Sequence, residues 1–209
     1  MKLYDFAMAP NARRVRMFAA EKGIELETVS IDLSKREQMN DGYRAINPRL
    51  AVPALVLDDG TLITESVAIC RYLDALAPEP ALFGTDAKDQ AIVEMWHRRV
   101  ELEGMQAVAD GVRNSVEFFA GRGLPGAVDF PQIPALAERG KQRVDLFFAM
   151  LNERLADSEY IAGDNFTIAD IAALIGCDFA KVIKKRISEE QSHLHRWYAA
   201  VRARPSASA

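Results

Sequence analysis

The chain has few cysteines, few histidines and no long hydrophobic run among its 209 residues. Its two cysteines, Cys70 and Cys177, lie far apart and outside any Cys-x-x-Cys pair, which predicts a reducing compartment and two buried free thiols. The one His-x-His pair points its rings to different sides of a helix, so we expect no metal site. The third histidine, His97, is expected to pair with Glu101 one turn later, at the surface or at an interface. No run of about 18 apolar residues and no signal peptide occur, which predicts a cytoplasmic protein that does not span a membrane.

An excess of positive charge is also absent, because 30 acidic residues outnumber 26 basic ones and the net charge is -4. Such a chain has no overall basic field for a nucleic acid backbone, so we expect no nucleic acid partner. One local basic run is predicted to be a solvated helix end: Lys181, Lys184, Lys185 and Arg186. A hydrophobic fraction of 49% and a charged fraction of 27% indicate a globular chain.

The first third of the chain alternates between strand and helix patterns. Strands are expected at 2–6, 27–31, 54–57 and 61–63, and helices at 10–23, 38–45 and 65–76. Pro10 suits the first position of a helix, and Asp59-Gly60 suits a hairpin turn. The predicted order is therefore βαβαββα.

The remainder of the chain is predicted to be all-helical. Prolines and glycines between residues 77 and 86 indicate a linker, so we expect one domain at 1–77, a linker at 78–88 and a helical domain at 89–209. Apolar residues recur at three to four positions from 89 to 116, which predicts one long helix, and further helices are expected at 136–155 and 171–182. Thr167 and Asp170 have the spacing of a capping box, so Asp170 is interpreted as structural.

Two short motifs carry polar groups suited to a small peptide. Pro53 next to a strand edge predicts a tight turn with a cis peptide bond, which leaves the backbone of Val52 free to pair with an extended ligand. Glu65 and Ser66 open a helix, whose free amides favour a carboxylate while the Glu65 side chain accepts from an ammonium. The alternative is that Glu65-Ser66 is only a favourable first turn and Pro53 only a loop residue.

Three motifs in this order resemble those of the cytosolic glutathione transferases: Val52-Pro53-Ala54-Leu55, Glu65-Ser66-x-Ala68-Ile69-x-x-Tyr72-Leu73 and Asp164-x-Phe166-Thr167-Ile168-Ala169-Asp170. The resemblance covers nearly the whole chain and implies an α/β plus all-α protein, with a thioredoxin-like N-terminal domain and an all-helical C-terminal domain. By resemblance, the backbone of Val52 would hold the cysteinyl part of glutathione, Pro53 would be cis, and Glu65 with Ser66 would hold the γ-glutamyl head.

The chain departs from the family at the position that activates the thiol. A Tyr, Ser or Cys usually lies near the start of the first helix, but Met8 and Ala9 stand here, which disfavours a mechanism based on a protein cysteine. The chain is therefore similar to atypical bacterial and fungal members without that residue. The helix start and the side chain of Asn11 are the first candidates for stabilising a thiolate, with Ser115 and Asn114 as further ones. Asn11 could instead be only a cap of the first turn.

Tyr4, in the first strand, is interpreted as a core aromatic residue. For the glycyl carboxylate of glutathione several donors stay open, namely Gln38, Arg36, Arg49, Arg13, Arg14 and the Ala51 backbone. Leu50 stands where some family members carry a polar residue, so this contact is expected to differ.

The hypothesis is a homodimeric glutathione transferase in detoxification, with the helix from Asp89 as a contact between subunits. Glutathione would be a co-substrate and no cofactor is expected. An apolar electrophile would contact Met8, Met105, Val108, Val112 and Phe118. Two alternatives stay open: a glutathione-dependent peroxidase or disulfide-bond reductase on the same fold, and a non-catalytic glutathione-binding module.

Overall fold

A computed structural model describes residues 1–209 of the chain. The chain divides into two compact units: residues 1–80 with 124–129 and 208–209, and residues 81–123 with 130–207. The first break, after Pro80, falls inside the segment predicted to be a linker. No helix in the structure combines the length and apolar character needed to cross a membrane.

The first unit contains a four-stranded mixed sheet. Its elements are β1 (Lys2–Asp5), α1 (Pro10–Glu21), β2 (Glu27–Ser30), the 3-10 turns η1 (Leu33–Lys35) and η2 (Glu37–Met39), α2 (Asp41–Ile46), β3 (Ala54–Val56), β4 (Leu62–Thr64) and α3 (Ser66–Leu76). The strand order is β2-β1-β3-β4, with β1 parallel to β2 and antiparallel pairing for the other two neighbours. The predicted thioredoxin-like order βαβαββα is confirmed, although α2 begins three residues later than expected.

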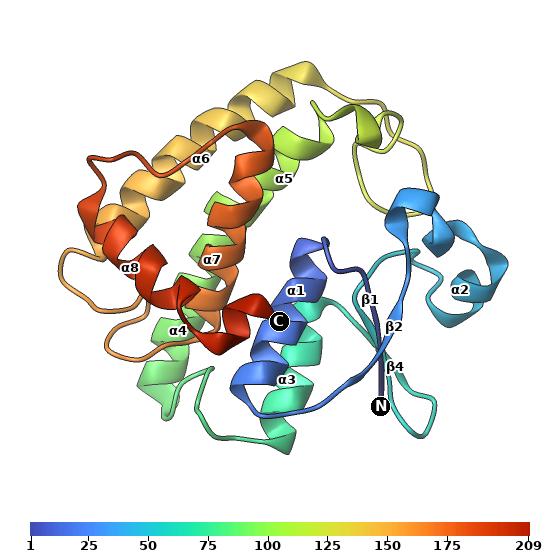
Figure 1. Ribbon diagram of the computed structural model, residues 1–209, viewed down its shortest axis with the longest axis horizontal. Coiled ribbons are helices and arrows are strands. Elements are labelled where there is room, and N and C mark those ends of the chain that lie inside the picture. The colour runs from blue at the N-terminus through green and yellow to red at the C-terminus, as the bar shows by residue number, and fades with distance from the viewer. The chain divides into compact units, whose positions relative to one another are not determined.

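Apolar faces of α1 and α3 form much of the core of this unit. Val15 and Phe18 of α1 are fully buried, as are Ile69 and Leu73 of α3, and both pairs have helical spacing. Figure 1 shows α1 and α3 side by side on one side of the strands and α2 on the other. Each such side chain contributes roughly 1.5–3 kcal/mol when buried. These apolar faces therefore hold α1 and α3 in the core of this unit.

The second unit is helical, as predicted. It contains α4 (Ala87–Arg99), the π-helical segment η3 (Val100–Met105), α5 (Gln106–Arg113), η4 (Glu117–Phe119), α6 (Pro134–Arg154), α7 (Ile168–Ala180), η5 (Lys181–Ile183) and α8 (Ser192–Arg202), and the chain ends in the 3-10 turn η6 (Pro205–Ser208). Figure 1 shows α5 and α6 packed along each other, and the two are in contact.

The single long helix predicted from 89 to 116 is wrong in two respects. A π-helical segment interrupts it, and the helical structure ends at Arg113. Gly104 lies in this segment against the ring of Phe147, where a Cβ atom would come within 2.5 Å of a ring carbon. Apolar spacing alone does not reveal such an insertion, because the same residues still face the core on either side of it.

The capping box predicted at the start of α7 is confirmed. The Asp170 carboxylate accepts hydrogen bonds from the backbone N–H of Thr167 at 3.0 Å, the Thr167 hydroxyl at 3.1 Å, the backbone N–H of Ile161 at 3.0 Å and Trp197 Nε1 at 2.8 Å. Burial raises the pKa of Asp170 to about 6, against these hydrogen bonds, which lower it. Asp170 is therefore structural, and α7 begins three residues earlier than predicted.

Both cysteines are buried free thiols, as predicted. Burial raises the pKa of Cys70 to about 12 and raises that of Cys177 as well. The predicted pairing of His97 with Glu101 is present, with Nε2 3.9 Å from Glu101 Oε1, but the His97 side chain is fully buried and not at the surface. Tyr4 is only half-buried and its ring lies 5.8 Å from that of Tyr43.

The basic run near η5 is largely solvated, as expected. Lys181, Lys184 and Arg186 are exposed, whereas Lys185 is half-buried and pairs with Asp145.

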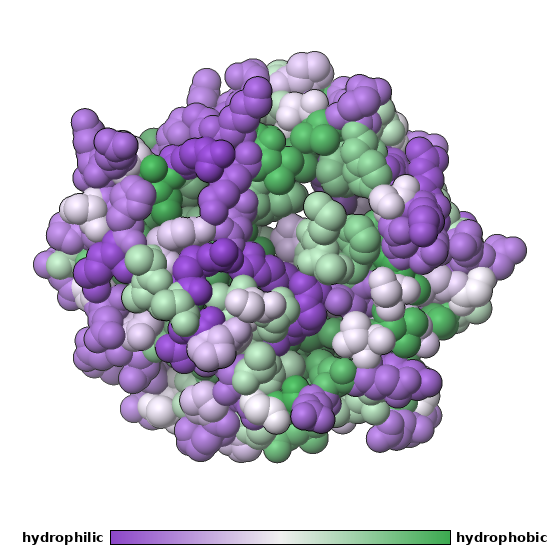
Figure 2. Space-filling view, viewed as in Figure 1, coloured by the Kyte–Doolittle hydropathy of each residue, from purple (hydrophilic) through white to green (hydrophobic).

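Figure 2 shows hydrophilic residues over most of the face in view, with hydrophobic residues in smaller patches between them.

Candidate functional site

Strand pairing brings three chain segments to one end of the sheet in the first unit. Tyr4 of β1 pairs with Ala54 of β3, and Ala54 pairs with Thr64 of β4. Because both pairings are antiparallel, the end of β1, the start of β3 and the end of β4 meet at the same edge. The loop into α1, the residues before β3 and the start of α3 therefore surround this edge.

The turn before β3 presents an unused backbone to this edge. The Val52–Pro53 peptide bond is cis, as predicted. The carbonyl of Ala51 is held by the Tyr43 hydroxyl at 2.6 Å and by Asn47 Nδ2 at 2.8 Å. Neither backbone group of Val52 makes a hydrogen bond within the chain, and the residue is only half-buried. Val52 can therefore offer both an N–H donor and a C=O acceptor to an extended ligand.

Glu65 adopts a strained conformation at the start of α3. It is the N-cap residue, with φ 67° and ψ 117°, and its side chain is exposed. A residue with a Cβ atom rarely adopts a positive φ of this kind, and such strain is concentrated at functional sites. Ser66, the first residue of the helix, is buried and its hydroxyl accepts from Arg14 Nη1 at 3.2 Å. A carboxylate side chain and a helix start thus lie together, as predicted.

The start of α1 carries two backbone donors without acceptors. Its N-cap is Ala9, which has no side-chain cap, and Pro10 has no N–H. The first backbone bond runs from the N–H of Arg13 to the Ala9 carbonyl at 3.0 Å, so the N–H groups of Asn11 and Ala12 have no partner. The alternative interpretation of Asn11 as a cap is wrong, because its side chain is exposed and makes no hydrogen bond. Met8 precedes this turn and is 83% exposed.

Gln38 stands out among the donors considered for the glycyl carboxylate. It is buried in η2, and its Oε1 atom has no hydrogen-bond partner. Oε1 can only accept a hydrogen bond, so the group that Gln38 can offer to a carboxylate is its Nε2 amide. Arg36 and Arg49 are exposed, and the Leu50 side chain is buried with a backbone φ of 56°. The backbone N–H of Leu50 donates to the Asn47 carbonyl at 3.0 Å, so Leu50 has no free donor for a carboxylate.

The polar candidates of the helical unit are engaged in its own structure. The Ser115 hydroxyl donates to the Gly111 carbonyl at 2.7 Å. Asn114 donates to the Asp110 carbonyl and accepts from the backbone N–H of Ile133, both at 2.9 Å. These bonds hold the end of α5 and the start of α6.

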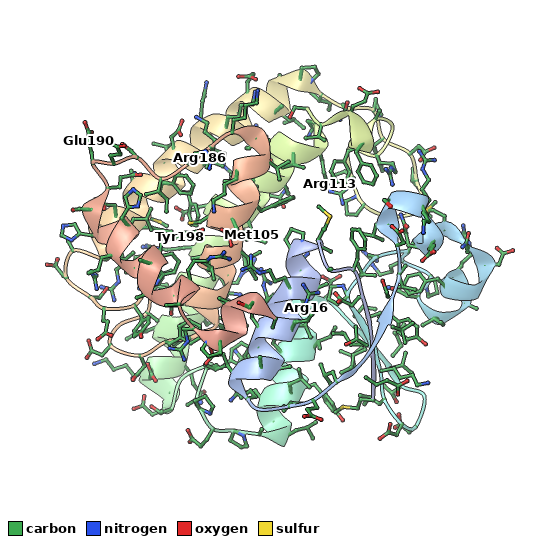
Figure 3. The ribbon with its side chains drawn as sticks, in the orientation of Figure 1. Arg16, Met105, Arg113, Arg186, Glu190 and Tyr198 are labelled. Atoms are coloured by element: carbon green, nitrogen blue, oxygen red, sulfur yellow. The ribbon has the colours of Figure 1, made fainter.

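Of the residues predicted to contact an electrophile in the helical unit, Val108 and Val112 are buried in its core. They have no exposed surface for a ligand in this structure. Met105, which is labelled in Figure 3, is half-buried at the end of the π-helical segment. Phe118 is 45% exposed. The contacts with an electrophile stay a prediction.

The sequence analysis missed an ion pair at the end of β1. The Asp5 carboxylate binds Arg16 of α1, with Nη1 2.5 Å and 2.7 Å from the two oxygens. The second nitrogen, Nη2, donates to the Ala7 carbonyl at 2.9 Å. The available signal was an acidic residue, Asp5, within the predicted strand of residues 2–6.

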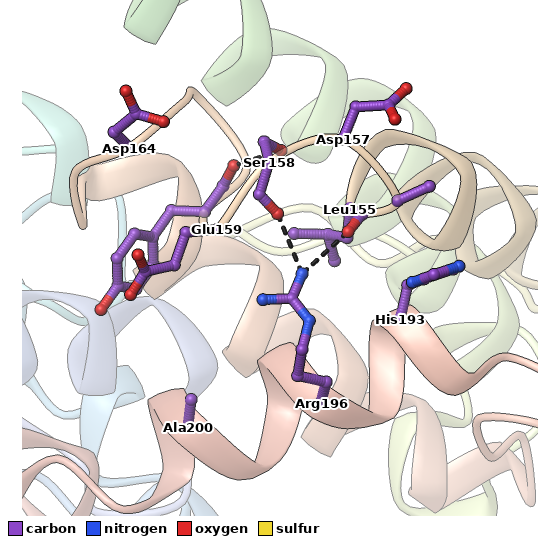
Figure 4. Close-up of a pocket in the computed structure, with 10 residues that line it drawn as sticks. Leu155, Asp157, Ser158, Glu159, Asp164, His193, Arg196 and Ala200 are labelled. Carbon is purple, nitrogen blue, oxygen red and sulfur yellow. Dashed lines mark hydrogen bonds between the residues drawn. The ribbon is translucent and has the colours of Figure 1, made fainter.

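One open cavity, of about 450 Å³, lies in the helical unit between the α6–α7 connection and α8 (Figure 4). Arg196 crosses it and donates to the carbonyls of Leu155 at 2.8 Å and Ser158 at 2.9 Å. None of the residues predicted for a functional site lines this cavity. Its arginine is already engaged in joining α8 to the end of α6.

Comparison with known proteins identifies the family of this chain. A family model described as the glutathione S-transferase N-terminal domain matches residues 3–81, and one described as the C-terminal domain matches residues 124–205. The chain is 35% identical to glutathione S-transferase 2 of Saccharomyces cerevisiae over 99% of its own length and 87% of that protein. The chain belongs to the glutathione S-transferase family and is an enzyme of that type.

Solved structures agree with this assignment over the whole chain. A glutathione S-transferase domain-containing protein from Marinobacter aquaeolei is similar with a TM-score of 0.91 and 38% identity, covering 99% of both chains. Gtt2 from Saccharomyces cerevisiae is similar with a TM-score of 0.90 and 32% identity, covering 99% of this chain and 98% of that one. The chain therefore has a glutathione-binding function of the transferase type. The roles of individual residues in that function are proposed below.

Proposed function

We propose that this enzyme binds reduced glutathione at the sheet edge of the first unit, stabilises its thiolate and adds it to apolar electrophiles. The observation that carries this proposal is the group of unused donors and acceptors at that edge. Val52 offers a free backbone, Glu65 offers a strained and exposed carboxylate, and α1 offers two free N–H groups. A γ-glutamyl tripeptide needs this combination of an ammonium acceptor, a backbone partner and a thiolate donor.

Each group has a specific role in the proposal. The Glu65 carboxylate accepts from the γ-glutamyl ammonium, and Ser66 with the start of α3 donates to the neighbouring carboxylate. The backbone of Val52 pairs with the cysteinyl residue, and Gln38 contacts the glycyl carboxylate. The N–H groups of Asn11 and Ala12 donate to the sulfur, which lowers its pKa from about 8.5. The Asn11 side chain is a further donor.

An ultraviolet difference titration of bound glutathione tests thiol activation. Thiolate absorbance should appear with a midpoint about 1–2 pH units below that of free glutathione, since each unit corresponds to about 1.4 kcal/mol and charge-assisted hydrogen bonds supply that much. Binding with an unshifted midpoint would contradict this activation and favour a non-catalytic binding protein. A panel of electrophiles, peroxides and disulfides then distinguishes conjugation from peroxidase or reductase activity, because all use the same thiolate.

The binding residues are tested with two matched carboxylates. Glu65→Gln should weaken glutathione binding about 10-fold to 100-fold, because a hydrogen bond to a charged group contributes about 1.5–3 kcal/mol. Glu27→Gln is the control, since Glu27 is an exposed carboxylate in β2 of the same unit and pairs only with Lys2. Calorimetry measures both affinities. Equal affinity of Glu65→Gln and the wild type would exclude Glu65 from the binding site.

The proposal extends to the oligomeric state, the cellular role and the location of the protein. We propose a cytoplasmic homodimer in detoxification, with a contact along α4 and η3, where Met95 and Leu102 are 45% and 52% exposed. Light scattering measures the mass, and Leu102→Asp should reduce it to that of one chain. A mass of one chain for the wild type would refute the dimer.

A further inference from the structure

The first turn of α1 lacks the local contact that usually fixes a helix start. Its N-cap is an alanine, and no side chain of the preceding loop accepts from the free N–H groups. The loop between β1 and α1 contains one backbone hydrogen bond of its own, from the N–H of Ala9 to the Phe6 carbonyl at 2.8 Å. Met8, in the middle of this loop, is 83% exposed and contributes little packing. Something else must keep this loop in place.

Arg16 supplies three hydrogen bonds that span this region. Nη1 binds both oxygens of Asp5, the last residue of β1, and Nη2 donates to the Ala7 carbonyl inside the loop. The side chains of Asp5 and Arg16 are only 7% and 18% exposed. Arg16 itself lies in the second turn of α1, so its guanidinium joins the strand, the loop and the helix (Figure 3).

The planar guanidinium is suited to this arrangement in a way that an ammonium is not. Its fixed donors bind a carboxylate through one nitrogen and a carbonyl through another at the same time. A lysine at this position carries the same charge on a single nitrogen. Partly buried ion pairs contribute little net stability, because desolvation offsets their attraction, and their clearest use is to select one conformation.

We propose that Arg16 is a positioning residue for the thiolate. It holds the loop of residues 6–9 through Ala7 and Asp5, and thereby keeps the N–H groups of Asn11 and Ala12 directed at the sulfur. Arg16 does not touch glutathione in this proposal and acts through the loop. The inference rests on the proposed stabilisation of the thiolate by the start of α1.

The test compares Arg16→Met and Arg16→Lys with a variant at the other end of the same helix. Lys22 follows α1, its side chain is fully buried, and its Nζ binds Asp74 at 2.6 Å and the Pro78 carbonyl at 2.8 Å. Lys22→Met therefore removes a buried charge from the same unit without touching the loop of residues 6–9. The readout is the midpoint of the thiolate titration of bound glutathione, together with the pH profile of kcat/KM.

Arg16→Met should raise the midpoint by about one pH unit, which is a tenfold loss of thiolate preference. Arg16→Lys should give a smaller rise, because it keeps the charge beside Asp5 and loses one of the two directions of donation. Lys22→Met should lower the melting temperature and leave the midpoint unchanged. Glutathione affinity at low pH, where the thiol is protonated, should stay within about twofold in all three variants, since each 1.4 kcal/mol is tenfold and no binding group is removed.

The failures of the two proposals are distinguishable. A wild-type midpoint equal to that of free glutathione would refute thiolate stabilisation itself. A lowered wild-type midpoint that both Arg16 variants keep would overturn the role of Arg16 alone. Equal shifts in Arg16→Met and Lys22→Met would also overturn it, because general loosening of the unit would explain both. If Arg16→Met does not fold, Arg16→Lys decides the question by the same criterion.

Discussion

Replacement of Asp170 by asparagine tests how the core of the helical unit is held together. The carboxylate is fully buried and accepts four hydrogen bonds, two at each oxygen. One oxygen serves Ile161 N–H and Trp197 Nε1, and the other serves the N–H and the hydroxyl of Thr167. Asparagine has nearly the same shape but keeps only one acceptor oxygen, so its amide nitrogen must face donors.

The expected loss follows from counting the donors that stay without an acceptor. If the asparagine oxygen faces Ile161 and Trp197, its NH2 group faces the N–H of Thr167, while the Thr167 hydroxyl can rotate to accept. One backbone N–H is then left unpaired beside another donor, at about 1–3 kcal/mol for the unpaired group, and the capping box at the start of α7 contributes about 1 kcal/mol. We expect Asp170→Asn to lower the free energy of unfolding by about 2–4 kcal/mol at pH 7, where the carboxylate is ionised. Asp170→Ala leaves three N–H groups unpaired and should exceed this.

Equilibrium unfolding in urea at one fixed protein concentration measures the effect, with tryptophan fluorescence as the signal. Asp157→Asn is the matched control, because Asp157 is an exposed carboxylate in the same unit, and its effect should stay within about 0.5 kcal/mol. A loss below about 1 kcal/mol for Asp170→Asn, with an unchanged urea dependence, would refute the reasoning. It would show that water or a shifted backbone satisfies the donors.

Four further outcomes are expected. Burial raises the pKa of Asp170 from 3.8 to about 6, so between these pH values the folded state keeps a proton that the unfolded state releases. The difference in free energy of unfolding between the wild type and Asp170→Asn should therefore shrink by up to about 3 kcal/mol from pH 4 to pH 7 in urea titrations. A constant difference would contradict this. Lys22→Met should cost about 1.5–3 kcal/mol in the same assay, since it leaves the half-buried Asp74 carboxylate without its cation; no loss would count against this ion pair. Gly104→Ala should lower stability by about 1–3 kcal/mol, because the new methyl would overlap the Phe147 ring, and Phe147→Leu in the same chain should recover part of the loss; an unchanged melting temperature would show that the π-helical segment can move away. Cys70 should react with a thiol reagent only at the rate of unfolding, because it is fully buried and its pKa is raised to about 12; fast reaction of the native protein would place it at the surface.

The regular elements of the fold were predictable because their signals are local. Pro10 at a helix start, the Asp59-Gly60 turn and the Thr167–Asp170 capping box each state a backbone geometry that depends on neighbouring residues alone. The π-helical segment depends instead on Gly104 meeting a ring from α6, a contact between residues 43 positions apart in the chain. The burial of His97 is likewise decided by packing partners and not by its neighbours in sequence.

The binding motifs were predictable to a similar extent and for a similar reason. The cis bond at Pro53 and the helix start at Ser66 follow from the sequence around them, and the structure contains both. That the two motifs share one sheet edge follows only from the register of β1, β3 and β4. The strain at Glu65 also arises there, because the chain must leave β4 and enter α3 within one residue.

The proposed means of activating the thiol was the least predictable part, because it consists of backbone groups and not of side-chain types. Met8 and Ala9 carry no hydroxyl or thiol, and the helical unit uses the side chains of Ser115 and Asn114 for its own hydrogen bonds. The free N–H groups of α1 exist because Ala9 cannot cap the helix and Pro10 contributes no donor. An absent cap is a weak signal in a sequence, although it leaves two donors open in the structure. In this chain the turn before α1 lacks both the usual thiol-activating side chain and a side chain that caps the helix. Because no side chain accepts from them, the N–H groups of this turn are open to a ligand.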